Sequence, residues 1–88
     1  MIEVQAAPTE GGFDCVVELG GPGSRARHNV RVATKDLKRW ARPGETPESL
    51  VARSFEFLLQ REPAHQVLKS FALSDIGRYF PEFDEAIR

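Results

Sequence analysis

The first third of the chain alternates apolar and polar residues, as expected for β-strands with one buried face. We predict strands over residues 2–7, 13–19 and 24–33, separated by glycine-rich turns at 9–12 and 20–23. The second strand has an apolar face formed by Phe13, Cys15, Val17 and Leu19. The third has an apolar face formed by Ala26, His28, Val30 and Val32.

The second and third strands are expected to form an antiparallel hairpin. A four-residue loop at 20–23 would place Leu19 opposite Ser24 and Cys15 opposite His28. In that register the two apolar faces coincide, and acidic side chains lie beside basic ones on the other face. A slip of one residue would destroy both matches.

Residues 47–62 carry the strongest helix signal in the chain. Thr46 is a favourable N-cap, Pro47 suits the first helical position, and Pro63 cannot continue a helix. The apolar side chains cover an arc of about 220°, whereas a helix on one sheet needs only about 100–140°. The strands alone cannot cover this helix, so either the C-terminal tail or a second subunit must pack on it.

Shorter helical segments flank this helix. We predict one over residues 35–41 with Thr34 as its N-cap, and another with Ser74 as its N-cap after an apolar cluster in residues 64–71. The predicted fold is a single α+β domain over residues 1–88, with strands in 1–33 and helices in 34–88. An antiparallel meander of two or three strands packs on a central helix at about 47–62, and short C-terminal helices close the core.

The composition limits the chemistry. The single cysteine, Cys15, excludes an intrachain disulfide, and with only His28 and His65 it falls short of a four-ligand zinc site. No segment is long and apolar enough to span a bilayer, and the first residues do not resemble a signal peptide. We expect a cytoplasmic protein that binds no membrane, metal or cofactor. A core this small often gains stability from a second subunit.

Charge is distributed unevenly. Residues 1–24 hold four acids and no Lys or Arg, whereas residues 25–42 hold seven bases and one acid. Such a basic stretch could bind phosphates, with an aromatic to stack a base. The alternative is cross-strand pairing with Asp14 and Glu18, and a sequence pI of about 6.1 is low for a nucleic-acid-binding domain. The candidate nucleic-acid contacts are Arg25, Arg27, Arg31, Lys35, Lys38, Arg39 and Trp40.

The broad apolar arc of the main helix includes Phe55, Phe57 and Leu59. These side chains either belong to the core or form a surface for a second copy of the chain or for another protein. Both interpretations are open at this point.

No catalytic group of residues is apparent. Cys15 and His28 lack a third residue to orient them and face the expected core, which favours a buried, inert thiol. The loop at 20–23 lacks the Lys-Ser/Thr ending of a phosphate-binding loop. We expect no catalytic, cofactor-binding or metal-binding residues. The predicted function is a non-catalytic interaction module that self-associates or binds a protein partner. The alternative is a nucleic-acid-binding protein that uses residues 25–42.

The second half carries a recognisable pattern. Residues 53–63 read RSFEFLLQREP, and residues 71–82 fit the pattern FxLSxIxxYFPE. This resembles a family of small uncharacterised prokaryotic proteins, over roughly the last 45 residues well and over the first 40 in outline. The resemblance implies that the helix and its tail form one unit. The family has no assigned activity, so the resemblance implies no catalytic residues.

Overall fold

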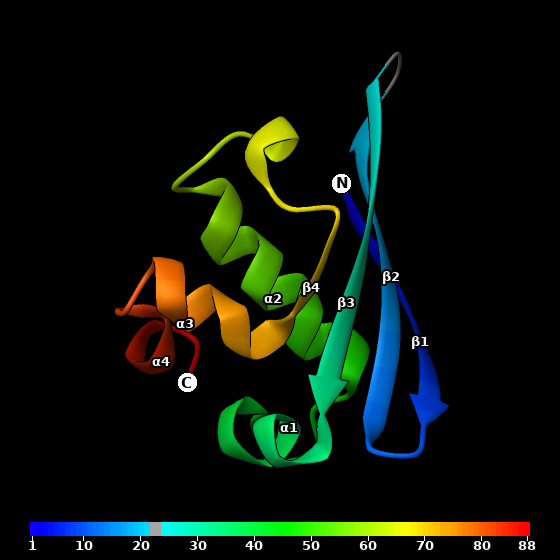
Figure 1. Cartoon of the computed structure of the whole chain (residues 1–88), viewed down its shortest axis with the longest axis vertical. Coiled ribbons are helices and arrows are strands. Elements are labelled where there is room, and N and C mark those ends of the chain that lie inside the picture. Colours follow the sequence, from blue (N-terminus) through cyan, green and yellow to red (C-terminus); the bar gives the residue numbers. More distant parts are fainter. Residues whose placement is uncertain (22–23) are drawn as a thin grey trace.

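A mixed sheet with the strand order β1-β2-β3-β4 forms one layer of the molecule, and the helices form the other (Figure 1). The computed structural model describes residues 1–21 and 24–88. The α+β class is confirmed, but within these residues the sheet has four strands rather than two or three. The elements are β1 (Ile2–Thr9), β2 (Gly12–Gly21), β3 (Ser24–Ala33), α1 (Thr34–Trp40), α2 (Pro47–Leu59), the 3-10 helix η1 (Ala64–Gln66), β4 (Ser70–Ala72), the 3-10 helix η2 (Leu73–Asp75), α3 (Ile76–Tyr79) and α4 (Phe83–Ala86).

The first three strands form an antiparallel meander, but the predicted hairpin register is wrong by two residues. Leu19 pairs with Ala26 rather than with Ser24, because residues 20 and 21 continue β2 instead of forming the loop. Residues 22 and 23 of the predicted loop lie outside the described part of the chain. Since side chains alternate with a period of two, a shift of two residues leaves the apolar faces of both strands together.

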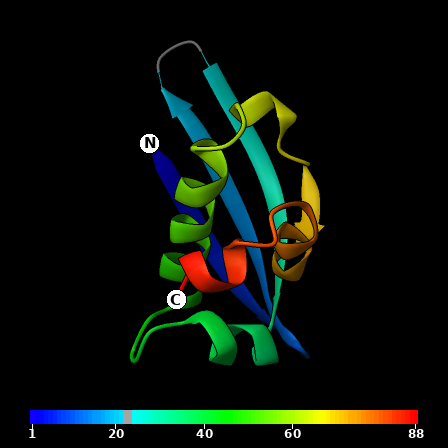
Figure 2. The ribbon, with the colours of Figure 1, turned by 90° about the vertical axis from the view of Figure 1, so that its left-hand side faces the viewer.

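Helix α2 lies across β1 and β2 on the inner face of the sheet (Figure 2). The hydroxyl of Thr46 accepts a hydrogen bond from the backbone N–H of Ser49 at 3.1 Å, which confirms the predicted N-cap. The helix ends at Leu59, before the predicted end at residue 62. The N–H groups of residues 61 and 62 both donate to the carbonyl of Leu58, and this tight turn closes the helix.

The C-terminal tail covers the part of α2 that the sheet leaves bare. The ring of Phe57 lies 6.0 Å from that of Phe80 and 5.1 Å from that of Phe83, measured between centroids. On the sheet side, Phe55 is fully buried and its ring lies 6.0 Å from that of Phe71. The chain therefore buries both α2 rings within its own core.

Strand β4 was not predicted, because residues 64–71 read as part of a helical region. It pairs in parallel with β3, with Ser70 opposite Asn29. The N–H of Asn29 also donates to the carbonyl of Lys69 at 2.7 Å. A strand of three residues is too short to show an alternating pattern in the sequence.

Two predicted N-caps are wrong. Thr34 is already the first residue of α1, and its hydroxyl donates to the carbonyl of Gly11 at 3.2 Å instead of capping the helix. Ser74 lies inside η2, where the carboxylate of Asp75 accepts the N–H of Ala72 at 3.1 Å. Helix α1 therefore begins at the predicted cap itself, and η2 begins one residue before it.

A partly buried ion pair fixes the loop before α2. Arg53 donates to both carboxylate oxygens of Glu45 at 2.7 Å, and the two side chains are 18% and 8% exposed. The same guanidinium donates to the carbonyl oxygens of Trp40 and Ile87. It thus joins the end of α1, helix α2 and the C-terminal turn, and satisfies polar groups that water reaches poorly.

This ion pair makes stability depend on pH. The hydrogen bonds from Arg53 lower the pKa of Glu45 from 4.5 to about 2. Because the folded state binds the proton less readily than the unfolded state, the stabilisation is present above pH 4.5 and is lost as the pH falls toward 2. We expect Glu45→Gln to lower the free energy of unfolding by about 2 kcal/mol at neutral pH. Urea denaturation over a pH series would contradict this if both proteins lost stability equally below pH 4.5.

Gly12 lies at the start of β2, where the neighbouring backbone leaves no room for a side chain. Its φ is +156°, and an added Cβ would lie 2.0 Å from the carbonyl oxygen of Val32, whereas Gly11 has nothing within 4 Å. We expect Gly12→Ala to lower the free energy of unfolding by about 2 kcal/mol and the matched Gly11→Ala to change it by less than about 0.5 kcal/mol. Chemical denaturation measures both, and equal effects would refute the difference.

Candidate interaction surface

Strand β1 is an edge strand, and its outer side faces no other strand of the described chain (Figure 2). The N–H of Gly20 donates to the carbonyl of Met1 at 3.3 Å, which makes these two residues a hydrogen-bonded pair. Such pairs alternate along an antiparallel ladder, so the odd-numbered residues of β1 bond to β2. The even-numbered residues direct their N–H and C=O groups outward, and they are Ile2, Val4 and Ala6.

Pro8 closes this free edge. It occupies the next outward-facing position of β1, opposite Phe13 of β2. There its missing N–H costs no bond to β2, which is why an edge strand tolerates it. Proline also blocks further pairing on the outer side. The backbone available to another strand is therefore that of residues 2–6.

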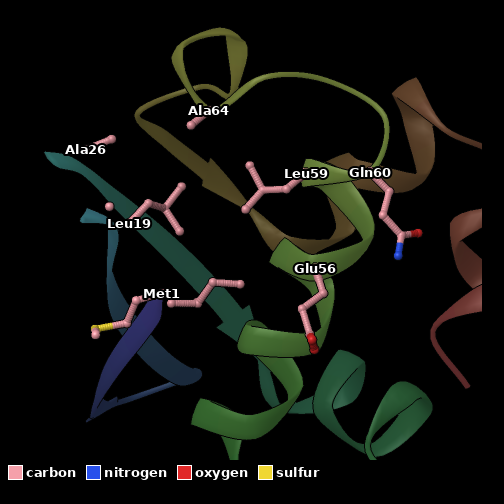
Figure 3. A pocket seen from close by; sticks show the side chains of 9 residues that line it. Met1, Leu19, Ala26, Glu56, Leu59, Gln60 and Ala64 are labelled. Carbon is pink, nitrogen blue, oxygen red and sulfur yellow. The ribbon is translucent and has the colours of Figure 1, made fainter. Parts of the chain in front are cut away.

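A cleft of about 470 Å³ adjoins the N-terminal end of β1. It lies between the strand ends and the last turn of α2, and Figure 3 shows Leu59 pointing from α2 toward Leu19. Its lining combines apolar side chains, among them Ile2 from the edge strand, with polar ones such as Glu56. The free edge and the cleft thus share Ile2 and form one continuous surface.

Of the three α2 residues predicted for an oligomer or partner surface, only Leu59 is accessible. Phe55 is 0% exposed and Phe57 is 7% exposed, so neither can contact another molecule in this structure. Leu59 is half-buried and lines the cleft. The width of the apolar arc could be predicted from the sequence, but which part the tail covers could not.

A second apolar groove, of about 330 Å³, lies between residues 66–68 and α3. Its rim carries Leu68 and Tyr79, which are 51% and 66% exposed. Phe71 and Ile76 form part of its floor. No described contact indicates what would occupy this groove.

None of the helices in the described part of the chain lies on the outer face of the sheet (Figure 1). Arg25, Arg27 and Arg31 are exposed on this face of β3, with Glu18 opposite Arg27 and Asp14 opposite Arg31. None of the ion pairs found among the described residues joins these side chains. Arg27 and Arg31 therefore have acidic residues opposite them, Arg25 lies opposite Gly20, and all three side chains extend into solvent.

Trp40, the aromatic residue beside the basic residues of α1, is not accessible to a ligand. Trp40 is 5% exposed, and its indole N–H donates to a carboxylate oxygen of Asp84 at 2.8 Å. Arg39 pairs with the same carboxylate at 3.0 Å. Lys35 and Lys38 are exposed. In this structure Trp40 is a core residue and cannot stack on a nucleotide base.

Cys15 and His28 lie inside the core, and Cys15 pairs with Val30 instead of His28. Burial raises the pKa of the Cys15 thiol to about 11, so it is protonated at neutral pH. His28 Nδ1 donates to the carbonyl of Leu68 at 2.7 Å, and no described residue bonds to its Nε2. None of the hydrogen bonds among the described residues joins this imidazole to the Cys15 thiol.

Residues 1–21 and 24–88, which the structure describes, contain neither a metal site nor a membrane-spanning helix. No cluster of three or more His, Cys, Asp or Glu side chains is placed to hold a metal ion. None of the helices in this part of the chain has both the length and the apolar character needed to cross a membrane.

Comparisons with models of protein families, with curated proteins and with solved structures find no match to this chain. The similarity of residues 53–82 to a prokaryotic family therefore stays a prediction. The candidate surface rests on geometry alone, and it consists of the free edge of β1 and the adjoining cleft.

Proposed function

We propose that the protein is a small non-catalytic interaction module that self-associates through the free edge of β1. The observation that supports this most directly is the set of outward N–H and C=O groups at Ile2, Val4 and Ala6. An exposed edge strand is a template for pairing with another strand, and natural proteins usually protect it. Self-association would satisfy these groups with an identical set.

The protections usually found on edge strands are weak in β1. Its register against β2 is continuous from Ile2 to Thr9, so no bulge twists the edge away. No lysine lies on the strand, and Pro8 blocks only its C-terminal end. The cleft beside Ile2 adds apolar side chains, such as that of Leu59, that a second chain can bury. A strand from another protein could use the same edge, which makes it the competing occupant.

The proposal assigns no catalytic, cofactor-binding or metal-binding residue. It also places the protein in the cytoplasm, because the single cysteine, Cys15, fits a reducing compartment.

The first test is the oligomeric state. We expect sedimentation velocity to show a monomer–dimer equilibrium between low and high micromolar concentration. Val4→Pro removes an outward N–H and should give a folded monomer, because that group makes no bond to β2. The matched Gln5→Pro removes an inward N–H and should lower the unfolding temperature instead. A wild-type chain that stays monomeric throughout would end the proposal.

A second candidate function is nucleic-acid binding, favoured by the exposed row of Arg25, Arg27 and Arg31 on the open sheet face. Alternate residues of a strand lie roughly 6.6 Å apart, close to the spacing of phosphates along a single strand. Against it, the described residues of this face include no aromatic to stack a base, since Trp40 is buried.

Fluorescence anisotropy with labelled random-sequence RNA and single-stranded DNA tests this candidate. If the row binds phosphates, Arg27→Gln with Arg31→Gln should weaken binding at low salt and reduce the salt dependence by about one phosphate contact per arginine. The matched control is Arg78→Gln, because the Arg78 side chain on α3 is 83% exposed and lies outside the row. This substitution should change neither the affinity nor its salt dependence. Absence of wild-type binding at low salt would reject the candidate.

A further inference from the structure

The geometry points to one particular dimer, in which the β1 strands of two copies pair antiparallel with Val4 on the two-fold axis. This inference rests on the self-association proposed above and specifies its register. The two four-stranded sheets would join into one continuous sheet, with all helices on the same side. The occupant of the edge is therefore a second copy of this chain.

The register follows from which backbone groups are free. In a two-fold antiparallel pair, the residue numbers of any two opposing residues add up to the same value. The pairs that exchange both hydrogen bonds must consist of outward-facing residues. Only one alignment pairs these three residues with one another: Ile2 opposite Ala6 of the second copy, and Val4 opposite Val4. Each of these pairs then satisfies both of its N–H and C=O groups.

Neighbouring alignments of the same parity leave some of these groups unpaired. A shift of two residues in one direction places Pro8 opposite Ile2, where the Pro8 carbonyl can accept from Ile2 but the Ile2 carbonyl has no donor, and the proline ring lies in the ladder. The shift in the other direction moves Ala6 past the first residue of β1. A shift of one residue brings in positions whose N–H groups already bond to β2. The free edge thus has one best self-complementary register.

The side chains agree with this register on both faces. On the open face, Glu3 lies opposite Gln5 of the second copy, so an amide can donate to each carboxylate and the two Glu3 carboxylates do not face each other. On the helix side, Ile2 meets Ala6 and Val4 meets Val4. Pro8 of the second copy becomes the diagonal neighbour of Ile2, which lines the cleft.

Disulfide trapping tests the register directly. Glu3 and Gln5 would form a non-hydrogen-bonded pair across the new ladder, where Cα atoms lie about 4.5 Å apart, within reach of a disulfide. Both residues are exposed, so Glu3→Cys and Gln5→Cys should leave the fold intact. Cys15 is 1% exposed and serves as the same unreactive background in each chain. We expect oxidation to link the two variants when they are mixed, and neither variant when it is alone.

The outcomes separate the register from the proposed function. Cross-linking of Glu3→Cys alone or of Gln5→Cys alone would overturn the register. A wild-type dimer whose mixed variants do not cross-link would also overturn it, while self-association would stand. A strict monomer would end both proposals.

A charge-reversal pair gives an independent readout. Gln5→Glu places a second carboxylate opposite Glu3 of the second copy, and Gln5→Lys places an ammonium there. Each substitution acts twice because the interface is symmetric. We expect the dissociation constant to rise about threefold or more for Gln5→Glu and to fall by a similar factor for Gln5→Lys. Shifts in the same direction for both variants would contradict the Glu3–Gln5 pairing.

Discussion

Helix α2 has more apolar surface than one sheet can cover, and most of the architecture follows from this constraint. The inner sheet face and Phe71 bury Phe55, while Phe80 and Phe83 from the tail bury Phe57. The tail must therefore return across the helix, and the contacts of Arg53 with Glu45 and with the C-terminal turn hold it near α2. The short β4 and the small α3 and α4 helices can be understood as parts of that return path.

Features encoded by neighbouring residues could be predicted from the sequence, and features that depend on distant contacts could not. The start of α2 needs only Thr46 and the proline after it, and the strand faces need only alternation. The hairpin register depends on how many of the glycines belong to β2 rather than to the turn. The alternation of apolar and polar residues does not show this number. The burial of Trp40 depends on Asp84, 44 residues away, so its pattern within α1 could not predict it.

The candidate surface was only partly predictable for a similar reason. Periodicity placed Leu59 on an apolar arc with Phe55 and Phe57, but only the folded chain separates the accessible residue from the buried ones. Whether a strand lies at an edge depends on strand order, which no single segment encodes. One local signal was present, since Pro8 near the end of a strand is typical of an edge position.

The arrangement of charge across the open sheet face has a consequence for the way partners approach. Asp14 and Glu18 lie on β2 and Glu3 on β1, whereas the arginine row lies on β3, so the face is negative toward one edge and positive toward the other. Such a lateral dipole orients charged molecules before contact. Anionic molecules are steered to the β3 side, whereas two copies that approach through their β1 edges repel each other, over distances that shrink as ionic strength rises.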